Sequence, residues 1–318
     1  MGQILSAIGS TAFYVPFLLV LAWCVHPLMG VRGLVMLMLS GTVNELVKLW
    51  TAEPRPYWTD PSIDPGASVS SFGMPSGHAQ NAVVVWGILA WTLGRRAAWA
   101  GAAALALGIG WSRYALGVHS PGQILVGWAI GLALLAGAVA WERRLGRWWR
   151  AQSPAVRLTT AVAPPLMLLA AAFLAARGLS DGAFPRTWTE AVLREGGDEL
   201  RISSDNAALG AGFLAGCLAG LVPRAGVPPL APAAGPGRAV LRLLIGAVPL
   251  ALLAAVYLAL VGLDTLYAPV LFVLAAAAGL WTVLGAPAAF DRLEGRAGEG
   301  APPPRLPRPG EHSDLREP

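Results

Sequence analysis

Three short groups of basic and polar residues stand out in a chain that is otherwise mostly apolar. They are Lys48 with Arg55-Pro56, then Pro75-Ser76-Gly77-His78, and finally Ser112-Arg113 with His119. Arginine offers paired, planar donors to a phosphate group and lysine a compact positive charge. Two imidazoles can act as nucleophile and general acid near neutral pH. These residue types predict phosphoryl transfer, in which catalysis is mostly positioning and stabilisation of charge.

Helix starts are expected to hold both histidines. Ser76, Gly77 and His78 stand where a helix should begin, and the free N–H groups of a helix start attract an anion. Gly77 lets the backbone approach that anion closely, and Ser76 can cap the helix, bind phosphate or do both. Ser120-Pro121 predicts a second helix start directly after His119, because serine is a common N-cap and proline a common first helical residue.

The elements that carry these groups are expected to be membrane-spanning helices. Of the 318 residues, 55% are apolar and 13% are charged, whereas about a quarter of a soluble domain is charged. Stretches of about 20 mostly apolar residues, the length of a membrane span, recur along the chain. This excludes a soluble protein with one anchor, and also an outer-membrane barrel, whose strands alternate apolar and polar residues. The predicted fold class is an all-α, polytopic membrane helix bundle with about nine transmembrane helices. The expected spans are 9–29, 33–51, 77–95, 98–116, 121–141, 158–176, 206–223, 241–263 and 265–285.

The distribution of arginine predicts the orientation of the bundle. Arginines gather in the linkers 95–96, 142–157 and 224–242, on one side of the nine expected spans. Cytoplasmic loops carry the excess of Lys and Arg. The chain is therefore expected to be a multi-pass protein of the cell (inner) membrane, with a cytoplasmic C-terminus. All three polar groups, including the 52–76 loop, then face the extracytoplasmic side.

The chain is expected to divide into three regions. Residues 1–157 form a catalytic transmembrane core, 158–285 add further transmembrane helices, and 286–318, rich in Pro, Gly and charge, form a disordered cytoplasmic tail. The outer segment 177–205 is either a lid over a site or a surface connector. Within it, Thr187–Glu190 resembles a capping box that opens a short helix.

Other residues are expected to have structural roles. The cysteines, Cys24 and Cys217, lie in apolar segments and indicate neither a disulfide nor a thiolate metal site. Glu45 is expected to form a structural ion pair, either with Lys48, one turn away, or with an arginine. Close helix contacts are expected at the glycines 127, 131, 212, 216 and 220, and an interfacial aromatic belt at Trp50, Tyr57 and Trp58. The net charge of +5 does not indicate nucleic acid as a partner, because it lies in loop arginines beside membrane segments.

Together the three groups resemble the three-part signature of the type 2 phosphatidate phosphatase superfamily. That superfamily includes lipid phosphate phosphatases, glucose-6-phosphatases, bacterial acid phosphatases and vanadium haloperoxidases. The groups are separated by 18 residues (57–74) and 33 residues (79–111), spacings that fit the signature. The resemblance implies that His119 is the nucleophile and forms a phosphohistidine, and that His78 is the general acid that later activates water. It implies phosphate binding by Lys48, Arg55, Ser76, Gly77 and Arg113, and it implies no metal or other cofactor.

One position departs from the signature. Many members carry an aspartate four residues after the nucleophile, where it orients the imidazole, and this chain has Gln123 there. Glucose-6-phosphatases are similar in having glutamine at this position, in the sequence Arg-Pro-Tyr-Trp (55–58 here) and in spanning the membrane nine times. We expect the amide oxygen of Gln123 to accept the Nδ1 proton of His119 and so to orient the ring without supplying charge.

The sequence thus predicts an integral membrane phosphatase, a metal-independent phosphoric ester hydrolase acting at the extracytoplasmic face. Its expected substrate is a lipid phosphate monoester or diphosphate of the phosphatidate or polyprenyl diphosphate class, and its partners are membrane lipids. A sugar-phosphate phosphatase of the glucose-6-phosphatase type is the alternative enzyme. A lipid-phosphate binder or transporter without catalysis is a third possibility, against which the complete set of polar residues argues.

Overall fold

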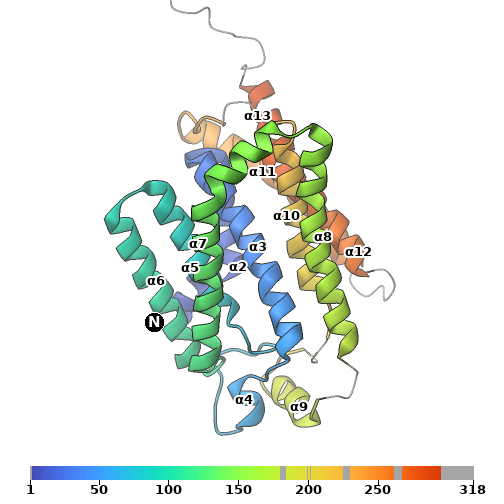
Figure 1. Cartoon of the computed structure of the whole chain (residues 1–318). Coiled ribbons are helices and arrows are strands. Elements are labelled where there is room, and N and C mark those ends of the chain that lie inside the picture. The colour runs from blue at the N-terminus through green and yellow to red at the C-terminus, as the bar shows by residue number, and fades with distance from the viewer. Residues whose placement is uncertain are drawn as a thin grey trace, which may run out of the picture.

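The structure is a computed structural model that describes residues 2–179, 184–198, 200, 202–224, 230–260 and 267–294. The elements in these ranges are all helices, most of them running along one axis (Figure 1). The first half of the chain contains α1 (Gly2–Ile8), α2 (Thr11–Val20), the π-helical turn η1 (Leu21–Val25), α3 (Pro27–Thr51), α4 (Pro56–Thr59), α5 (Gly77–Leu93), α6 (Arg96–Ala115) and α7 (Pro121–Ala151). The second half contains α8 (Pro154–Gly178), α9 (Arg186–Arg194), α10 (Asp205–Leu221), α11 (Pro236–Leu260), α12 (Tyr267–Leu280), the π-helical turn η2 (Trp281–Gly285) and α13 (Ala286–Leu293).

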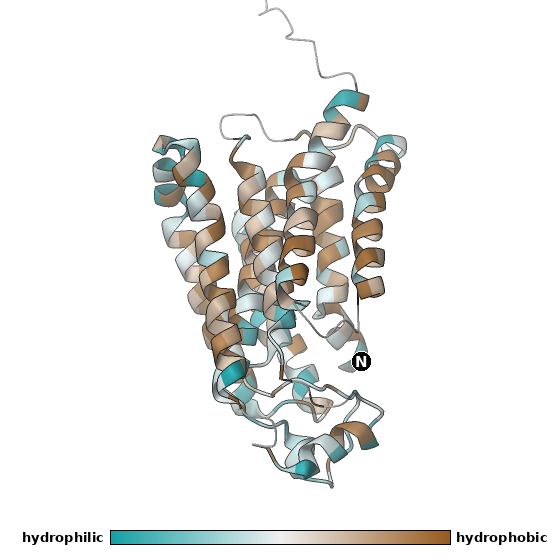
Figure 2. Ribbon diagram, turned by 90° about the vertical axis from the view of Figure 1, so that its right-hand side faces the viewer, coloured by the Kyte–Doolittle hydropathy of each residue, from teal (hydrophilic) through white to brown (hydrophobic). Residues whose placement is uncertain are grey.

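The multi-span membrane fold predicted from composition is confirmed, but the count of nine spans is not. A helix occupies each of the nine expected places, yet only five in the described ranges are long and apolar enough to cross a membrane. The number rises to six if α1 and the α2–η1 helix, which meet at 50°, form one bent span. Two of the others, α5 and α10, have 17 residues each. Apolar residues line the helices along most of their length, and hydrophilic ones gather toward the ends (Figure 2).

Helix α3 joins the two halves of the bundle. It packs against α5 on one side and against α8 and α10 on the other. Buried side-chain amides and hydroxyls connect α3 to α5: Gln80 accepts from Asn44 Nδ2 at 2.9 Å and donates to the carbonyl of Ser40 at 2.8 Å, and Ser40 donates to Asn81 at 2.7 Å. Polar contacts of this kind fix one helix against another inside a membrane bundle. They hold the first turns of α5 in register with the end of α3.

Close helix contacts are present at four of the five glycines at which they were expected, 127, 131, 212 and 216, and not at Gly220. A Cβ at Gly127 of α7 would lie 2.7 Å from the carbonyl oxygen of Ser76, and one at Gly131 would lie 2.8 Å from that of Gln80. Helix α7 therefore rests directly on the first turns of α5. In the second half, a Cβ at Gly216 would lie 2.0 Å from a carbonyl oxygen of α12, so α10 and α12 also touch through their backbones. At Gly220 the added Cβ would meet only ordinary contacts.

Two of the three aromatic residues expected in an interfacial belt are instead buried. Trp50 is 81% exposed, but Tyr57 and Trp58 of α4 are almost fully enclosed. Trp58 packs against Trp188 of α9, with ring centroids 5.8 Å apart. The described part of the 177–205 segment therefore covers α4, and in α9 the buried residues are Ala191 and Val192. The prediction of a capping box at Thr187–Glu190 is wrong, because α9 begins at Arg186 with Pro185 in the N-cap position.

The tail begins later than the sequence predicted. Residues 286–293 form α13. The sequence predicts disorder there because the region 286–318 as a whole is rich in Pro, Gly and charge. Phe290 is buried against Trp23, with ring centroids 6.1 Å apart, and Arg242 donates to both carboxylate oxygens of Glu294 at 2.6 and 2.8 Å. This contact ties α13 to α11, and the remainder of the predicted tail, 295–318, lies outside the described residues. Cys24 and Cys217 are free and buried, as the sequence predicted.

Candidate active site

The three polar groups meet at one end of the bundle, the end beside α4 and α9 in Figure 1. Lys48 lies in the last turn of α3 and Arg113 in that of α6. Arg55 stands just before α4, Ser76 just before α5, and His119 two residues before α7. All five side chains are buried. Gly77 and His78 form the first turn of α5 and are partly buried.

His119 is held from both sides of its ring. Its Nδ1 lies 3.0 Å from Oε1 of Gln123, and its Nε2 lies 3.0 Å from Nη1 of Arg55. A guanidinium group can only donate, so Nε2 is the acceptor and the ring proton lies on Nδ1, which donates to Gln123. The predicted contact between Gln123 and His119 is therefore present. The free lone pair on Nε2 is the one that can attack phosphorus.

The start of α7 explains why the ring is held. Ser120 is the N-cap: its Oγ accepts from the backbone N–H of Gln123 at 3.3 Å, while Oε1 of Gln123 accepts from the N–H of Ser120 at 3.3 Å. Pro121 follows at the first helical position. This reciprocal capping box satisfies two free N–H groups and fixes Gln123, one turn after His119, against the imidazole. The helix start predicted from Ser120-Pro121 is confirmed.

Arg55 is an organising residue of the site. Its guanidinium donates to the carbonyls of Ser71 at 2.7 Å, Val118 at 3.0 Å and Phe72 at 3.2 Å, besides His119. These bonds join the loop before α5 to the loop before α7. Four of its five N–H groups are committed to the carbonyls of Ser71, Val118 and Phe72 and to the hydroxyl of Ser71. The Nη1 N–H that faces Nε2 of His119 is therefore the one that an anion bound there would meet, as a charge-assisted donor.

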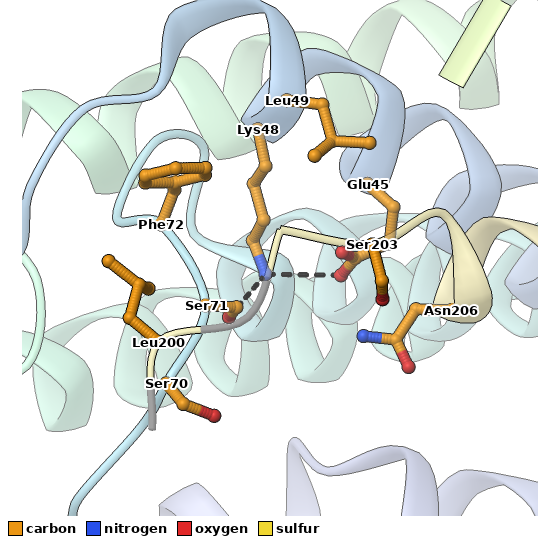
Figure 3. A pocket seen from close by; sticks show the side chains of 9 residues that line it. All are labelled: Glu45, Lys48, Leu49, Ser70, Ser71, Phe72, Leu200, Ser203 and Asn206. Atoms are coloured by element: carbon orange, nitrogen blue, oxygen red, sulfur yellow. Dashed lines mark hydrogen bonds and ion pairs between the residues drawn. The ribbon is translucent and has the colours of Figure 1, made fainter. Parts of the chain in front are cut away.

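Ser71 belongs to the site although no sequence pattern points to it. Its Oγ accepts from Nη2 of Arg55 and from Nζ of Lys48, each at 3.2 Å. Lys48 also forms the expected ion pair with Glu45, at 3.2 Å, and Figure 3 shows the ammonium group between these two partners. Ser71 is 23 residues from Lys48, so only the fold brings the two together.

Two polar atoms near the start of α5 have no partner among the described residues. Ser76 occupies the N-cap position, but its hydroxyl does not cap the helix and is buried without a hydrogen bond. The Nε of Arg113 is also buried and unbonded, while its Nη1 donates to the hydroxyl of Ser6 in α1. A buried donor without a partner is costly, and a bound phosphate would satisfy both atoms. The contact with Ser6 was not foreseen, because nothing in residues 1–8 signals a place in the site.

The electrostatic environment keeps the ring of His119 neutral. Burial of the ring, with the charges of Arg55, Arg113 and Lys48, holds the pKa of His119 well below its usual value. The hydrogen bond to Gln123 acts in the opposite direction and is outweighed. A lowered pKa means that the unprotonated, nucleophilic form persists to lower pH than in a free histidine. The three positive charges that disfavour an imidazolium are suited to a dianionic phosphate.

A small cavity of about 40 Å³ lies beside Lys48. The first half of the chain supplies Glu45, Lys48 and Ser71 to its lining, and the segment at the start of α10 supplies Ser203 and Asn206 (Figure 3). Leu49, Phe72 and Leu200 complete the lining, and the volume is that of a few water molecules. No pattern in residues 200–206 predicts that they reach the site. In the part of the chain that the structure describes, no three His, Cys, Asp or Glu side chains gather as a metal site would require.

Two parts of the chain match models of known protein families. Residues 30–147 match the model of the PAP2 superfamily, and residues 208–298 match that of the PAP2 superfamily phosphatase, transmembrane extension. Phosphatidylglycerophosphatase B of Bacillus subtilis (strain 168) is 31% identical over 127 residues, which are 36% of this chain and 60% of that protein. The chain thus spans less than two thirds of that relative's length.

A solved structure is also similar in part. It is the first transmembrane PAP2 type phosphatidylglycerolphosphate phosphatase from Bacillus subtilis, with 23% sequence identity and a TM-score of 0.40. The similarity covers 45% of this chain and 76% of that one.

Proposed function

Since the chain belongs to the PAP2 superfamily, we propose that it is a metal-independent membrane phosphatase that hydrolyses a lipid phosphate through a phosphohistidine. The observation that carries the proposal is the arrangement around His119. Gln123 takes the Nδ1 proton, Arg55 faces the Nε2 lone pair, and Lys48 and Arg113 add positive charge. Such a site combines a neutral nucleophile with preorganised donors for the charge that develops on the phosphoryl oxygens.

In the proposed reaction, Nε2 of His119 attacks phosphorus while the bond from phosphorus to the leaving oxygen breaks. His78 donates its proton to that oxygen. Arg55 turns its Nη1 donor from Nε2 to a phosphoryl oxygen, and Ser76, Gly77, Lys48 and Arg113 bind the phosphoryl oxygens. His78 then takes a proton from water, the water oxygen attacks phosphorus, and the P–N bond breaks to release phosphate and neutral His119.

The proposed substrate is a lipid phosphate monoester or diphosphate, of the phosphatidate, phosphatidylglycerophosphate or polyprenyl diphosphate class. The name of the Bacillus relative supports the second of these. The site lies at the ends of α3, α5, α6 and α7, where a headgroup could enter while its chains remain in the bilayer.

A sugar-phosphate phosphatase is the second candidate, and Gln123 together with Arg55–Trp58 favours it. Tyr57 and Trp58 pack into the interior, however, so they are not available to stack on a sugar. A binder without catalysis is disfavoured, because it would need no lone pair on His119 held toward the bound anion.

The function is tested by assaying purified protein in detergent against lipid and sugar phosphates. We expect the protein to release phosphate from a lipid phosphate. EDTA should not affect this hydrolysis, and vanadate should inhibit it, because vanadate mimics the five-coordinate phosphorus. Magnesium-treated and EDTA-treated samples of the same preparation serve as matched controls. Loss of activity with EDTA, restored by a metal, would rule out the metal-independent mechanism, and release from sugar phosphates alone would favour the second candidate.

We further propose nine membrane crossings, with residues 1–157 as catalytic core, 158–285 as additional helices, the active site extracytoplasmic and the C-terminus cytoplasmic. The arginine-rich linkers 95–96 and 142–157 lie at the end of the helices opposite His119, which supports this orientation.

Cysteines introduced at the exposed positions Ser62 and Ser153 should differ in labelling by an impermeant thiol reagent on intact cells. We expect label at 62 and not at 153. The unmodified chain is the control, because Cys24 and Cys217 are buried. Label at 153 alone would reverse the orientation.

A further inference from the structure

The side chain of Gln123 has every hydrogen-bonding position filled. Its amide nitrogen donates to Oε1 of Glu53 at 3.0 Å and to the carbonyl of Pro54 at 2.8 Å. Its oxygen accepts from Nδ1 of His119 at 3.0 Å and from the N–H of Ser120 at 3.3 Å. The residue is 1% exposed, so water does not compete for these bonds. Two acceptors on one side and two donors on the other specify which end of the amide faces the histidine.

The surroundings leave Gln123 little freedom to shift. A Cβ at Gly73 would lie 2.5 Å from the Gln123 amide nitrogen, so the loop before α5 passes directly over the side chain. That loop is tied to Glu53 by a backbone bond from Gly73 N–H to the Glu53 carbonyl, at 2.7 Å. If the amide were flipped, its oxygen would face the carboxylate of Glu53 and the carbonyl of Pro54. All three groups are acceptors, so no hydrogen bond could form between them.

We infer that Glu53 is a positioning residue, which acts through Gln123 to keep the proton of His119 on Nδ1 and the lone pair on Nε2. The carboxylate accepts one of the two Gln123 N–H groups, and this orients the amide oxygen toward the imidazole. Glu53 does not touch the substrate in this account. The inference rests on the proposed function for its kinetic consequence, but its structural consequence, the tautomer of His119, can be measured without any reaction.

The first test reads the tautomer by ¹⁵N NMR of histidine-labelled protein in detergent without substrate. The His119 signals are assigned by their loss in His119→Gln. We expect a single Nδ1–H tautomer in the wild type, a mixture in Glu53→Ala, and restoration in Glu53→Gln, whose amide oxygen can accept the same bond. An unchanged tautomer in Glu53→Ala would overturn the inference whether or not the protein is a phosphatase. Asp60→Asn is the matched control, since Asp60 is exposed on the same loop and its carboxylate accepts from Ser62, a neighbour in sequence, rather than from a residue of the site.

The second test is a double-mutant cycle on turnover. Loss of a partner that orients a reactive ligand typically costs about 10–100-fold, so we expect Gln123→Leu to lower kcat by about that factor and Glu53→Ala by about 10-fold. Because Glu53 acts through Gln123, the double variant should be no slower than Gln123→Leu alone. Glu53→Gln should retain most of the wild-type kcat. Multiplied losses in the double variant would show that Glu53 acts by another route, whereas a wild type without phosphatase activity would refute the proposed function and leave the tautomer result to decide this inference.

Discussion

Replacing His119 with alanine should abolish turnover, lowering kcat by at least about 10⁴-fold. Removal of the nucleophile from an enzyme with a covalent intermediate costs a factor of this order or more, and what remains comes from binding and charge stabilisation. Among the residues that the structure describes, the group hydrogen-bonded to Nε2 is the guanidinium of Arg55, which is a donor and not a nucleophile. Brief incubation with a ³²P-labelled substrate followed by alkaline quenching should trap an alkali-stable, acid-labile phosphoenzyme in the wild type and none in His119→Ala.

The matched control is His26→Ala. His26 also stands at a helix start, where its ring accepts from the N–H of Met29, but it precedes α3 and so lies at the opposite end of that helix from Lys48. Loss of its capping bond should cost about 1 kcal/mol of stability and leave kcat near the wild-type value. An active His119→Ala protein, or a phosphoenzyme that forms without His119, would contradict the proposed mechanism.

The chemistry of the site was predictable where it depends on local sequence. Ser120-Pro121 fixes a helix start through capping, and Gln123 lies one helical turn from His119, so their contact follows from spacing alone. The groups around Lys48, Arg55 and His78 were recognisable because few residue types bind phosphate or transfer its protons. The predicted membrane topology placed these three polar groups at the same end of the helices, and the structure brings them together at that end.

What the sequence did not reveal are the partners that come from far along the chain. Ser71 joins Lys48 to Arg55, Ser6 bonds Arg113, and Glu53 supports Gln123 across 70 residues. A serine or glutamate in a loop carries no pattern that distinguishes such a role from solvation.

Long-range packing also explains the errors in the predicted fold. The sequence predicts an interfacial position for Tyr57 and Trp58, because tryptophan and tyrosine are enriched at membrane interfaces. In the structure α9 packs over them instead. Composition suggested disorder at 286–293, whereas the burial of Phe290 and the ion pair of Arg242 with Glu294 order that segment as a helix.

Replacing His78 with alanine should produce a loss that depends on the leaving group. With an alkyl phosphate the leaving oxygen needs a proton, and loss of a general acid typically costs about 10²–10⁴-fold. With p-nitrophenyl phosphate the leaving group departs without one, so the first step should be much less affected. His78 lies in the first turn of α5 and its ring adjoins Gly9, where an added Cβ would be 3.3 Å from its Cδ2, so a truncated side chain leaves space that water can enter.

The second step separates the two roles proposed for His78. Hydrolysis of the phosphohistidine requires activation of water whichever substrate formed it, so His78→Ala should release nitrophenolate in a burst of about one equivalent per site, then turn over slowly. Comparison of the two substrates on one variant controls for misfolding, because a damaged site would slow both alike. Equal losses with alkyl and nitrophenyl phosphates, without a burst, would mean that His78 binds the phosphate rather than transferring protons, and the general acid would then have to be sought among the other groups that face His119.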